Sequence, residues 1–239
     1  LPVGGPAVYK SSHRIRDKMH KLAAHKLGLD VDSLIFDNGK FTDKKNPKKT
    51  ITIQAVAKAA YYGAEVPPDM EPGLEDICFF HPSGMVFSFG SHICKVEVDP
   101  ETGEVKILKY FAVGDPGKII NPVAAEGQEH GGTLQAIGQA LYEEVVHDSN
   151  GQILTGSFMD YALPNAEMTP NFITDHTETI SPMNPLGSKG YGEAATTGAT
   201  PAVANAVMDA LKPLGITHIQ LPITSQKVWG AIKSSKSQK

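Results

Sequence analysis

The stretch Val86–Val113, VFSFGSHICKVEVDPETGEVKILKYFAV, decides the fold class of this chain. In its second half Val105, Ile107 and Phe111 fit the two-residue alternation of a half-buried strand. Pro100–Gly103 supplies turn residues between this half and the apolar residues before it. The sequence therefore predicts two strands joined by a tight turn, over residues 86–99 and 104–113.

Helical patterns flank the two predicted strands. Residues 6–27 place apolar side chains at three- and four-residue steps, with Pro6 in the first turn and Gly28 as a stop signal. Two further helices are predicted over 122–142 and over 200–211, the latter opened by Thr200-Pro201. The remaining predictions are hairpins around Asp37-Asn38-Gly39 and Asp148–Gly151, a helix over 53–62, strands over 172–180 and 219–221, a helix over 224–232 and a frayed tail over 234–239.

The order of these elements indicates the fold class. Hairpins alternate with helices, and the steady βαβ order of a parallel sheet is missing. The 239 residues, 41% hydrophobic and 20% charged, are enough for a buried core. We therefore expect an α+β fold in which helices pack on a mainly antiparallel sheet. We expect one domain over residues 1–239, without an internal repeat.

Several classes of protein are excluded by simple features of the chain. No run approaches the roughly 18 apolar residues of a membrane span, and no signal peptide is visible. Cys78 and Cys94 are too few for a zinc or iron–sulfur site, which needs about four ligands. Two reduced thiols fit a cytoplasmic protein. The chain begins at Leu1 and not at Met, which suggests a fragment or a processed chain.

The charge is unevenly distributed along the chain. Residues 1–50 carry 11 Lys/Arg and 5 Asp, giving +6, whereas the other 189 residues carry 11 Lys/Arg and 21 Asp/Glu, giving −10. A basic segment can meet a phosphate or another subunit, or it can be a solvated face. Basic and aromatic residues do not alternate as in single-stranded nucleic-acid grooves, so we expect no nucleic-acid partner.

The helical segment that begins at Pro122 contains four glycines, although each interior glycine costs a helix about 0.5–1 kcal/mol relative to alanine. Two explanations are open: close packing against a neighbouring element, or a ligand held against the glycines. Gln128, Gly131 and Gln135 recur at three- and four-residue steps, so one face carries amides beside glycine. Gln128 could then exchange hydrogen bonds with a heteroaromatic ring.

A second glycine-rich segment, Pro185–Glu193 (PLGSKGYGE), ends in a carboxylate. Its glycines, at positions 187, 190 and 192, allow positive φ and let several N–H groups point at one anion. Glu193 is either a reactive group beside a ligand or a solvated side chain in a loop. Lys189 could also make Glu193 an ion-pair partner. We predict that Glu193 is held by the glycine turn and not by a salt bridge.

These residues resemble, in identity and order, the molybdopterin-binding large subunit of the xanthine dehydrogenase, aldehyde oxidoreductase and aerobic carbon monoxide dehydrogenase family. The resemblance runs through nearly the whole chain; Ala136 departs from it, because the family usually has glycine there. The motifs that carry it are Gly4–Tyr9, Asn121-Pro122, Gly127-Gln128, Gly131-Gly132, Gln135, Ile137-Gly138, Asp160-Tyr161 with Pro164, Gly187 with Lys189-Gly190 and Gly192-Glu193, and Leu221–Thr224.

The resemblance implies a molybdopterin-type cofactor, in its plain or dinucleotide form, beside a catalytic base at Glu193. The family holds molybdenum through the dithiolene of the cofactor, so no protein metal ligand is expected. Glu193 would accept a proton from the water-derived oxygen, and partial burial would raise its pKa. The residues expected at the cofactor are Gln128, Gly131, Gly132, Gln135, Lys189, Gly190, Tyr191 and Gly192.

The implied activity is oxidation of a small substrate with water-derived oxygen, and aldehydes, N-heterocycles and carbon monoxide all fit the motifs. The upstream half of the family's catalytic subunit is absent from this sequence. We therefore expect the isolated chain to be inactive, and expect that half, together with iron–sulfur and FAD subunits, as partners. The alternative is a non-catalytic cofactor-binding or assembly module of the same fold. Glu193 with its flanking glycines favours the enzyme, because a binding module needs no base there.

Overall fold

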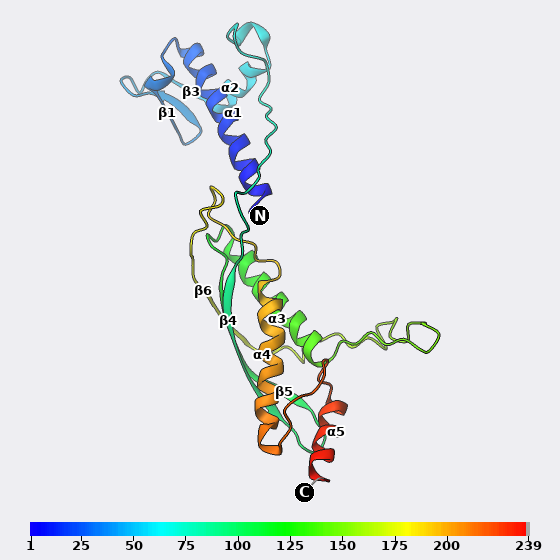
Figure 1. Ribbon diagram of the computed structural model, residues 1–239. Coiled ribbons are helices and arrows are strands. Elements are labelled where there is room, and N and C mark those ends of the chain that lie inside the picture. The colour runs from blue at the N-terminus through cyan, green and yellow to red at the C-terminus, as the bar shows by residue number, and fades with distance from the viewer. Residues whose placement is uncertain (238–239) are drawn as a thin grey trace. The chain divides into compact units, whose positions relative to one another are not determined.

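A computed structural model describes residues 1–237 of the chain. It divides into two compact units, which we call the N-terminal unit (Val3–Pro82) and the C-terminal unit (Ser83–Lys239). Each unit has a hydrophobic core of its own. Helices pack on short, mainly antiparallel sheets in both units, so the predicted α+β class is confirmed (Figure 1).

The N-terminal unit contains the first predicted hairpin. Strands β1 (Leu34–Asp37) and β2 (Lys40–Asp43) pair antiparallel across a two-residue turn. Asn38 and Gly39 both have positive φ in this turn, 45° and 73°, as a tight hairpin turn with the twist of its strands requires. A third strand, β3 (Thr50–Thr52), pairs with β2 and was not predicted, because its three residues show no alternation.

Two helices cover the core of the N-terminal unit. Helix α1 (Gly4–Leu27) begins two residues before the predicted start and ends at Gly28, whose φ of 62° is left-handed. Helix α2 (Ile53–Ala60) is capped by the Thr52 hydroxyl, which accepts a hydrogen bond from the Ala55 N–H at 3.3 Å. Leucine, phenylalanine and valine side chains from the helices and strands meet in the core.

The C-terminal unit is built on a sheet of three strands. The two predicted long strands are β4 (Phe89–Val98) and β5 (Val105–Asp115), which pair antiparallel. The predicted strand over 172–180 is shorter, β6 (Phe172–His176), and it pairs in parallel with β5. A parallel partner requires a long connection, and the chain between β5 and β6 contains helix α3 (Pro122–Leu141).

Helix α4 (Ala194–Leu211) corrects the sequence prediction. It begins six residues before Thr200 and holds Pro201 inside it. Proline removes one backbone donor from a helix, and the sequence favours such a residue in the first turn. Helix α4 nevertheless packs against both α3 and β4, so tertiary contacts override this signal (Figure 1). The consequence is that Glu193 stands immediately before a helix and not within an open loop.

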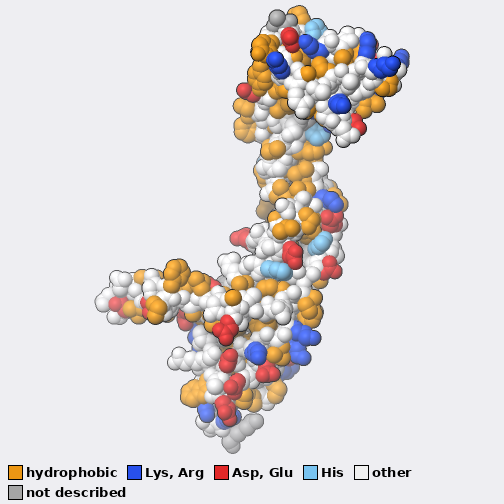
Figure 2. All heavy atoms as spheres, turned by 180° about the vertical axis from the view of Figure 1, so that it is seen from behind, with side chains coloured by type: hydrophobic (Ala, Val, Ile, Leu, Met, Phe, Trp, Pro, Cys, Tyr) orange, Lys and Arg blue, Asp and Glu red, His pale blue; other side chains and the backbone are white. Residues whose placement is uncertain are grey.

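The last helix and the long connection complete the unit. Helix α5 (Ser225–Lys236) follows its Thr224 cap and continues past the predicted end, so the expected frayed tail begins as helix; residues 238–239 lie outside the described residues. The predicted strand over 219–221 is absent from the described residues. The predicted second hairpin is reduced to one bridge, between His147 and Ile153, in a segment that extends away from α3 and carries exposed hydrophobic side chains (Figures 1 and 2).

Among residues 1–237, no helix combines the length and apolar character that crossing a bilayer demands.

Candidate functional site

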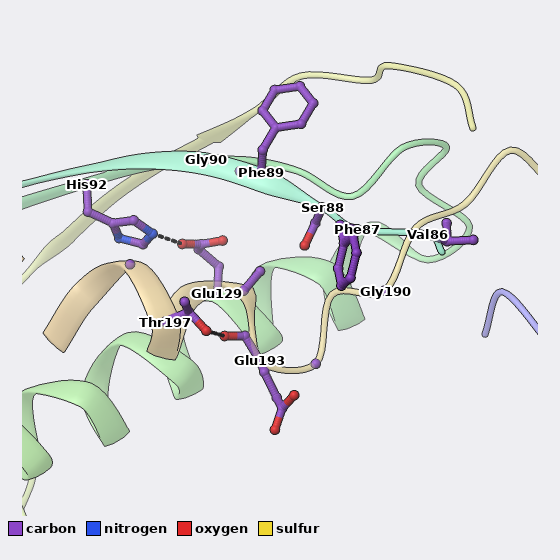
Figure 3. Close-up of a pocket in the computed structure, with 14 residues that line it drawn as sticks. Val86, Phe87, Ser88, Phe89, Gly90, His92, Glu129, Gly190, Glu193 and Thr197 are labelled. Carbon is purple, nitrogen blue, oxygen red and sulfur yellow. Dashed lines mark hydrogen bonds and ion pairs between the residues drawn. The ribbon is translucent and has the colours of Figure 1, made fainter. Parts of the chain in front are cut away.

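Glu193 occupies the cap position of α4 and lies between two hollows of the C-terminal unit. Its carbonyl oxygen accepts hydrogen bonds from the Thr197 N–H at 3.0 Å and the Thr197 hydroxyl at 2.9 Å. Its side chain is exposed and points away from Glu129 and His92 (Figure 3). We call the first hollow, of about 720 Å³, the main cavity, and the second, of about 460 Å³, the glutamine recess. The partial burial expected of Glu193 is therefore wrong for this chain.

The main cavity has an apolar wall and a polar interior. The start of β4 and the residues before it supply Val86, Phe87 and Phe89, and the interior carries His92 and Glu129 (Figure 3). The glutamine recess differs, because it is lined by amide and hydroxyl groups of Gln135, Gln139 and three threonines of α4. Glu193 and Gly192 belong to both linings, so this turn forms the boundary between them.

Lys189 is directed into the protein. Its Nζ lies 2.8 Å from Asp115 Oδ1 and 4.3 Å from the centroid of the Phe89 ring, and only 9% of its side chain is exposed. The predicted absence of a salt bridge to Glu193 agrees with this geometry. The ammonium group of Lys189 is paired with Asp115, so the expected cofactor contact of Lys189 stays a prediction about its backbone.

Asp115 connects distant segments around this buried pair. Burial raises the pKa of its carboxyl, but hydrogen bonds from Lys189, Thr177, Thr179 and the Gly117 N–H outweigh this effect and hold the pKa well below its usual range. Its side chain is fully buried. The segment before Glu193 is thus anchored by a charged, hydrogen-bonded centre.

The glycines of the second motif act in different ways. Gly187 has a φ of 68°, which favours glycine, but Gly190 and Gly192 do not have positive φ, contrary to expectation. Gly190 instead approaches the neighbouring backbone, donating its N–H to the Val86 carbonyl at 3.2 Å. Gly192 is exposed, and a Cβ atom there would meet nothing within 4 Å. Close approach of the backbone explains the glycine at position 190, whereas Gly192 has open space beside it.

Of the two explanations of the glycine-rich helix, close packing holds at Gly132 of α3. A Cβ atom at Gly132 would lie 2.9 Å from the Ala195 Cβ, so Gly132 serves close packing of α3 on α4 and not contact with a ligand. Gly131 is exposed and has open space beside it. Gln128, also exposed, donates from Nε2 to the Gly192 carbonyl at 2.8 Å, and Gln135 lines the glutamine recess.

The sequence analysis did not identify Glu129 and His92, two polar residues of the main cavity. Tyr191 was expected at the cofactor, but its hydroxyl is directed inward and donates a hydrogen bond to Glu129. Glu129 falls on the buried stripe of α3, and this charged residue at an apolar position was a usable signal. His92 occupies an inward position of β4, in step with Cys94 and Val96, and interrupts the apolar alternation there.

Known proteins share this fold and these motifs. Residues 1–170 match the molybdopterin cofactor-binding domain. The chain is 37% identical to the carbon monoxide dehydrogenase large chain of Hydrogenophaga pseudoflava over 97% of its own length and 29% of that protein. It is 38% identical to the nicotine 6-hydroxylase large subunit of Paenarthrobacter nicotinovorans, over 97% of its length and 28% of that protein.

A solved structure agrees with these relatives. The reconstituted CO dehydrogenase from Oligotropha carboxidovorans superimposes with a TM-score of 0.88 at 36% identity, covering 98% of this chain and 29% of that one. The chain thus spans less than a third of the length of the relatives it matches. By its domain match and by this identity, the chain belongs to the family of molybdopterin-binding large subunits that its motifs predicted.

Proposed function

We propose that this chain forms part of the catalytic subunit of a molybdenum hydroxylase and that Glu193 is its catalytic base. The observation that carries the proposal is the freedom of the Glu193 carboxylate. It is exposed at the boundary of the main cavity and the glutamine recess, and it forms no ion pair within the described part of the chain. The nearby cation of the motif, Lys189, is occupied by Asp115.

The residues beside Glu193 fit a pterin-type cofactor. A pterin presents ring nitrogens and a carbonyl, and the side-chain amides of Gln128 and Gln135 can both donate and accept hydrogen bonds. Gly131 leaves open space beside these amides. We propose that both units belong to one cofactor-binding region.

When bound, the cofactor supplies two-electron oxidation with an oxygen that comes from water. In this proposal Glu193 accepts the proton released at that oxygen, and base catalysis of this kind contributes about a hundred- to ten-thousand-fold in rate. Gln128 and Gln135 hold the cofactor edge, and the hydrogen bond from Gln128 to the Gly192 carbonyl aims the turn that carries Glu193. Phe87 and Phe89 limit water on the apolar wall.

The proposed substrate is a small aldehyde, an N-heterocycle or carbon monoxide. The relatives named for carbon monoxide and for nicotine are almost equally similar to this chain, so the similarity supports the proposed reaction type and favours no single substrate. The proposed partners are the remainder of the molybdenum subunit and iron–sulfur and flavin subunits. Matched relatives named as a large chain or large subunit support such an assembly.

The test is Glu193→Gln in the full-length subunit within its native complex. The probe is whichever of benzaldehyde, quinoline, nicotine or carbon monoxide the wild-type complex oxidises with an artificial electron acceptor. We expect turnover to fall at least about a hundredfold while molybdenum content stays unchanged. Glu101→Gln, in the exposed turn between β4 and β5, is the matched control. Wild-type turnover of the Glu193 variant with full molybdenum would refute the assignment.

A further inference from the structure

Glu129 lies on the buried face of α3 with only 2% of its surface exposed. A buried carboxylate is costly unless it is paired or hydrogen bonded. The Tyr191 hydroxyl donates to Glu129 Oε2, whereas Oε1 has no hydrogen-bond partner among residues 1–237. The Tyr191 hydroxyl is therefore the donor that offsets the cost of burying this charge.

His92 lies on the other side of Glu129 but does not replace Tyr191. Its Nε2 is 3.9 Å from Glu129 Oε1, and its Nδ1 is 3.0 Å from the hydroxyl of Tyr110 (Figure 3). Burial lowers the pKa of His92, although the Glu129 carboxylate opposes this shift. At 3.9 Å the imidazole is too far from the carboxylate for a hydrogen bond. Loss of the Tyr191 contact would leave Glu129 without a donor.

Two glycines leave the room that this arrangement needs. A Cβ atom at Gly114 would lie 2.9 Å from Glu129 Oε2 and would collide with the Tyr191 hydroxyl. A Cβ atom at Gly198 would lie 2.6 Å from His92 Nε2. Neither glycine has positive φ, so backbone conformation does not call for glycine at these positions. Glycine is needed at these positions because a side chain would occupy the space of the Tyr191 hydroxyl or the His92 ring.

Tyr191 stands two residues before Glu193, between glycines that are each held by one neutral hydrogen bond. We propose that Glu129 is a positioning residue: by binding the Tyr191 hydroxyl it fixes the segment 190–193, and with it the carboxylate of Glu193 at the main cavity. This inference rests on the proposed role of Glu193 as the base.

The first test is Tyr191→Phe in the full-length subunit within its native complex, assayed with the probe substrate that the wild type oxidises. We expect hydrogen exchange of the Gly190 amide, which donates to the Val86 carbonyl, to become at least about tenfold faster, because the segment loses its central anchor. We expect kcat to fall about ten- to a hundredfold with little change in KM, because a misaligned base weakens the transition state and not substrate binding. Tyr142→Phe, a half-buried tyrosine outside this contact, is the matched control.

A second series separates positioning from general stability. Glu129→Gln keeps an oxygen that accepts from Tyr191, so it should retain slow exchange of the Gly190 amide and a kcat within about threefold of wild type. Glu129→Leu should lose both. Gly114→Ala should reproduce Tyr191→Phe, because its methyl group displaces the hydroxyl.

Unchanged exchange of the Gly190 amide in Tyr191→Phe would overturn the inference, whatever the change in kcat. Exchange is measured without turnover. An active Glu193→Gln enzyme, which refutes the proposed base, is therefore distinguishable from a failure of Glu129 to hold the segment.

Discussion

The five residues from Lys189 to Glu193 belong to two contrasting regions of the molecule. Lys189 and Tyr191 are directed into a buried polar region, where they meet Asp115 and Glu129. Gly192 and Glu193 lie in an exposed region at the boundary of two hollows. The comparison shows that one short motif both anchors the turn and exposes the carboxylate of Glu193, the proposed base. A cation in such a motif can thus have a structural role, while the nearby carboxylate is exposed.

The largest expected effect is on the anchored side. Lys189→Met should lower the free energy of unfolding by about 3–5 kcal/mol, because it leaves the fully buried Asp115 carboxylate without its cation. Lys118→Met is the control: Lys118 pairs with Glu178 at 2.9 Å, but 52% of its side chain is exposed, so it should cost at most about 1 kcal/mol. Denaturant unfolding of the subunit measures both. Equal losses of unfolding free energy in Lys189→Met and Lys118→Met would contradict a special structural role for the buried pair.

On the exposed side, substitution of Glu193 should lower activity without lowering stability. Glu193→Gln should raise the reaction barrier by at least about 2.7 kcal/mol, the equivalent of a hundredfold loss of turnover. Its free energy of unfolding should stay within about 0.5 kcal/mol of wild type, because the side chain is exposed and unpaired in the described part of the chain. A stability loss above about 1 kcal/mol would show that Glu193 also anchors the turn.

Adjacent glycines of α3 give a finer contrast. Gly132→Ala should destabilise the unit by about 1–3 kcal/mol, because its methyl group would press on Ala195. Gly131→Ala has open space and should stabilise the helix by about 0.5–1 kcal/mol. If a cofactor lies against this face, Gly131→Ala should at the same time lower molybdenum content. Thermal unfolding and metal analysis measure the two effects, and opposite signs in the two variants are the critical result.

The smallest effect at neutral pH concerns Asp115. The pKa of its carboxyl is depressed in the folded state, so its stabilising contribution is present above the unfolded value of about 3.9 and is lost as pH falls through the folded value. Stability should therefore decline below about pH 4. In the double variant Asp115→Asn, Lys189→Met this decline should be shallower, while the curves above pH 5 stay parallel. Unfolding midpoints measured from pH 7 to pH 2 supply the comparison.

The sequence predicted the long strands, the helices and the turn at Asn38-Gly39, because these depend on local periodicity and local turn chemistry. It did not predict the parallel pairing of β6, which depends on where a distant segment returns. It indicated a special turn before Glu193, but it did not show that the side chains of Lys189 and Tyr191 are directed inward, to Asp115 and Glu129. Spacing alone cannot tell which side of a turn a side chain enters; that choice is made by Asp115 and Glu129, more than 60 positions away in the chain.

The contacts of Asp115 have a consequence for how the chain folds. Thr177 is 62 positions and Lys189 is 74 positions from this carboxylate, so both contacts close long loops. Pairing of β6 with β5 closes most of that distance first, and the later contacts then add only short loops. The turn that carries Glu193 should consequently be among the last parts to become ordered. Doubling a closed loop costs only about 0.6 kcal/mol, so the exposed connection between α3 and β6 can vary in length without disturbing that turn.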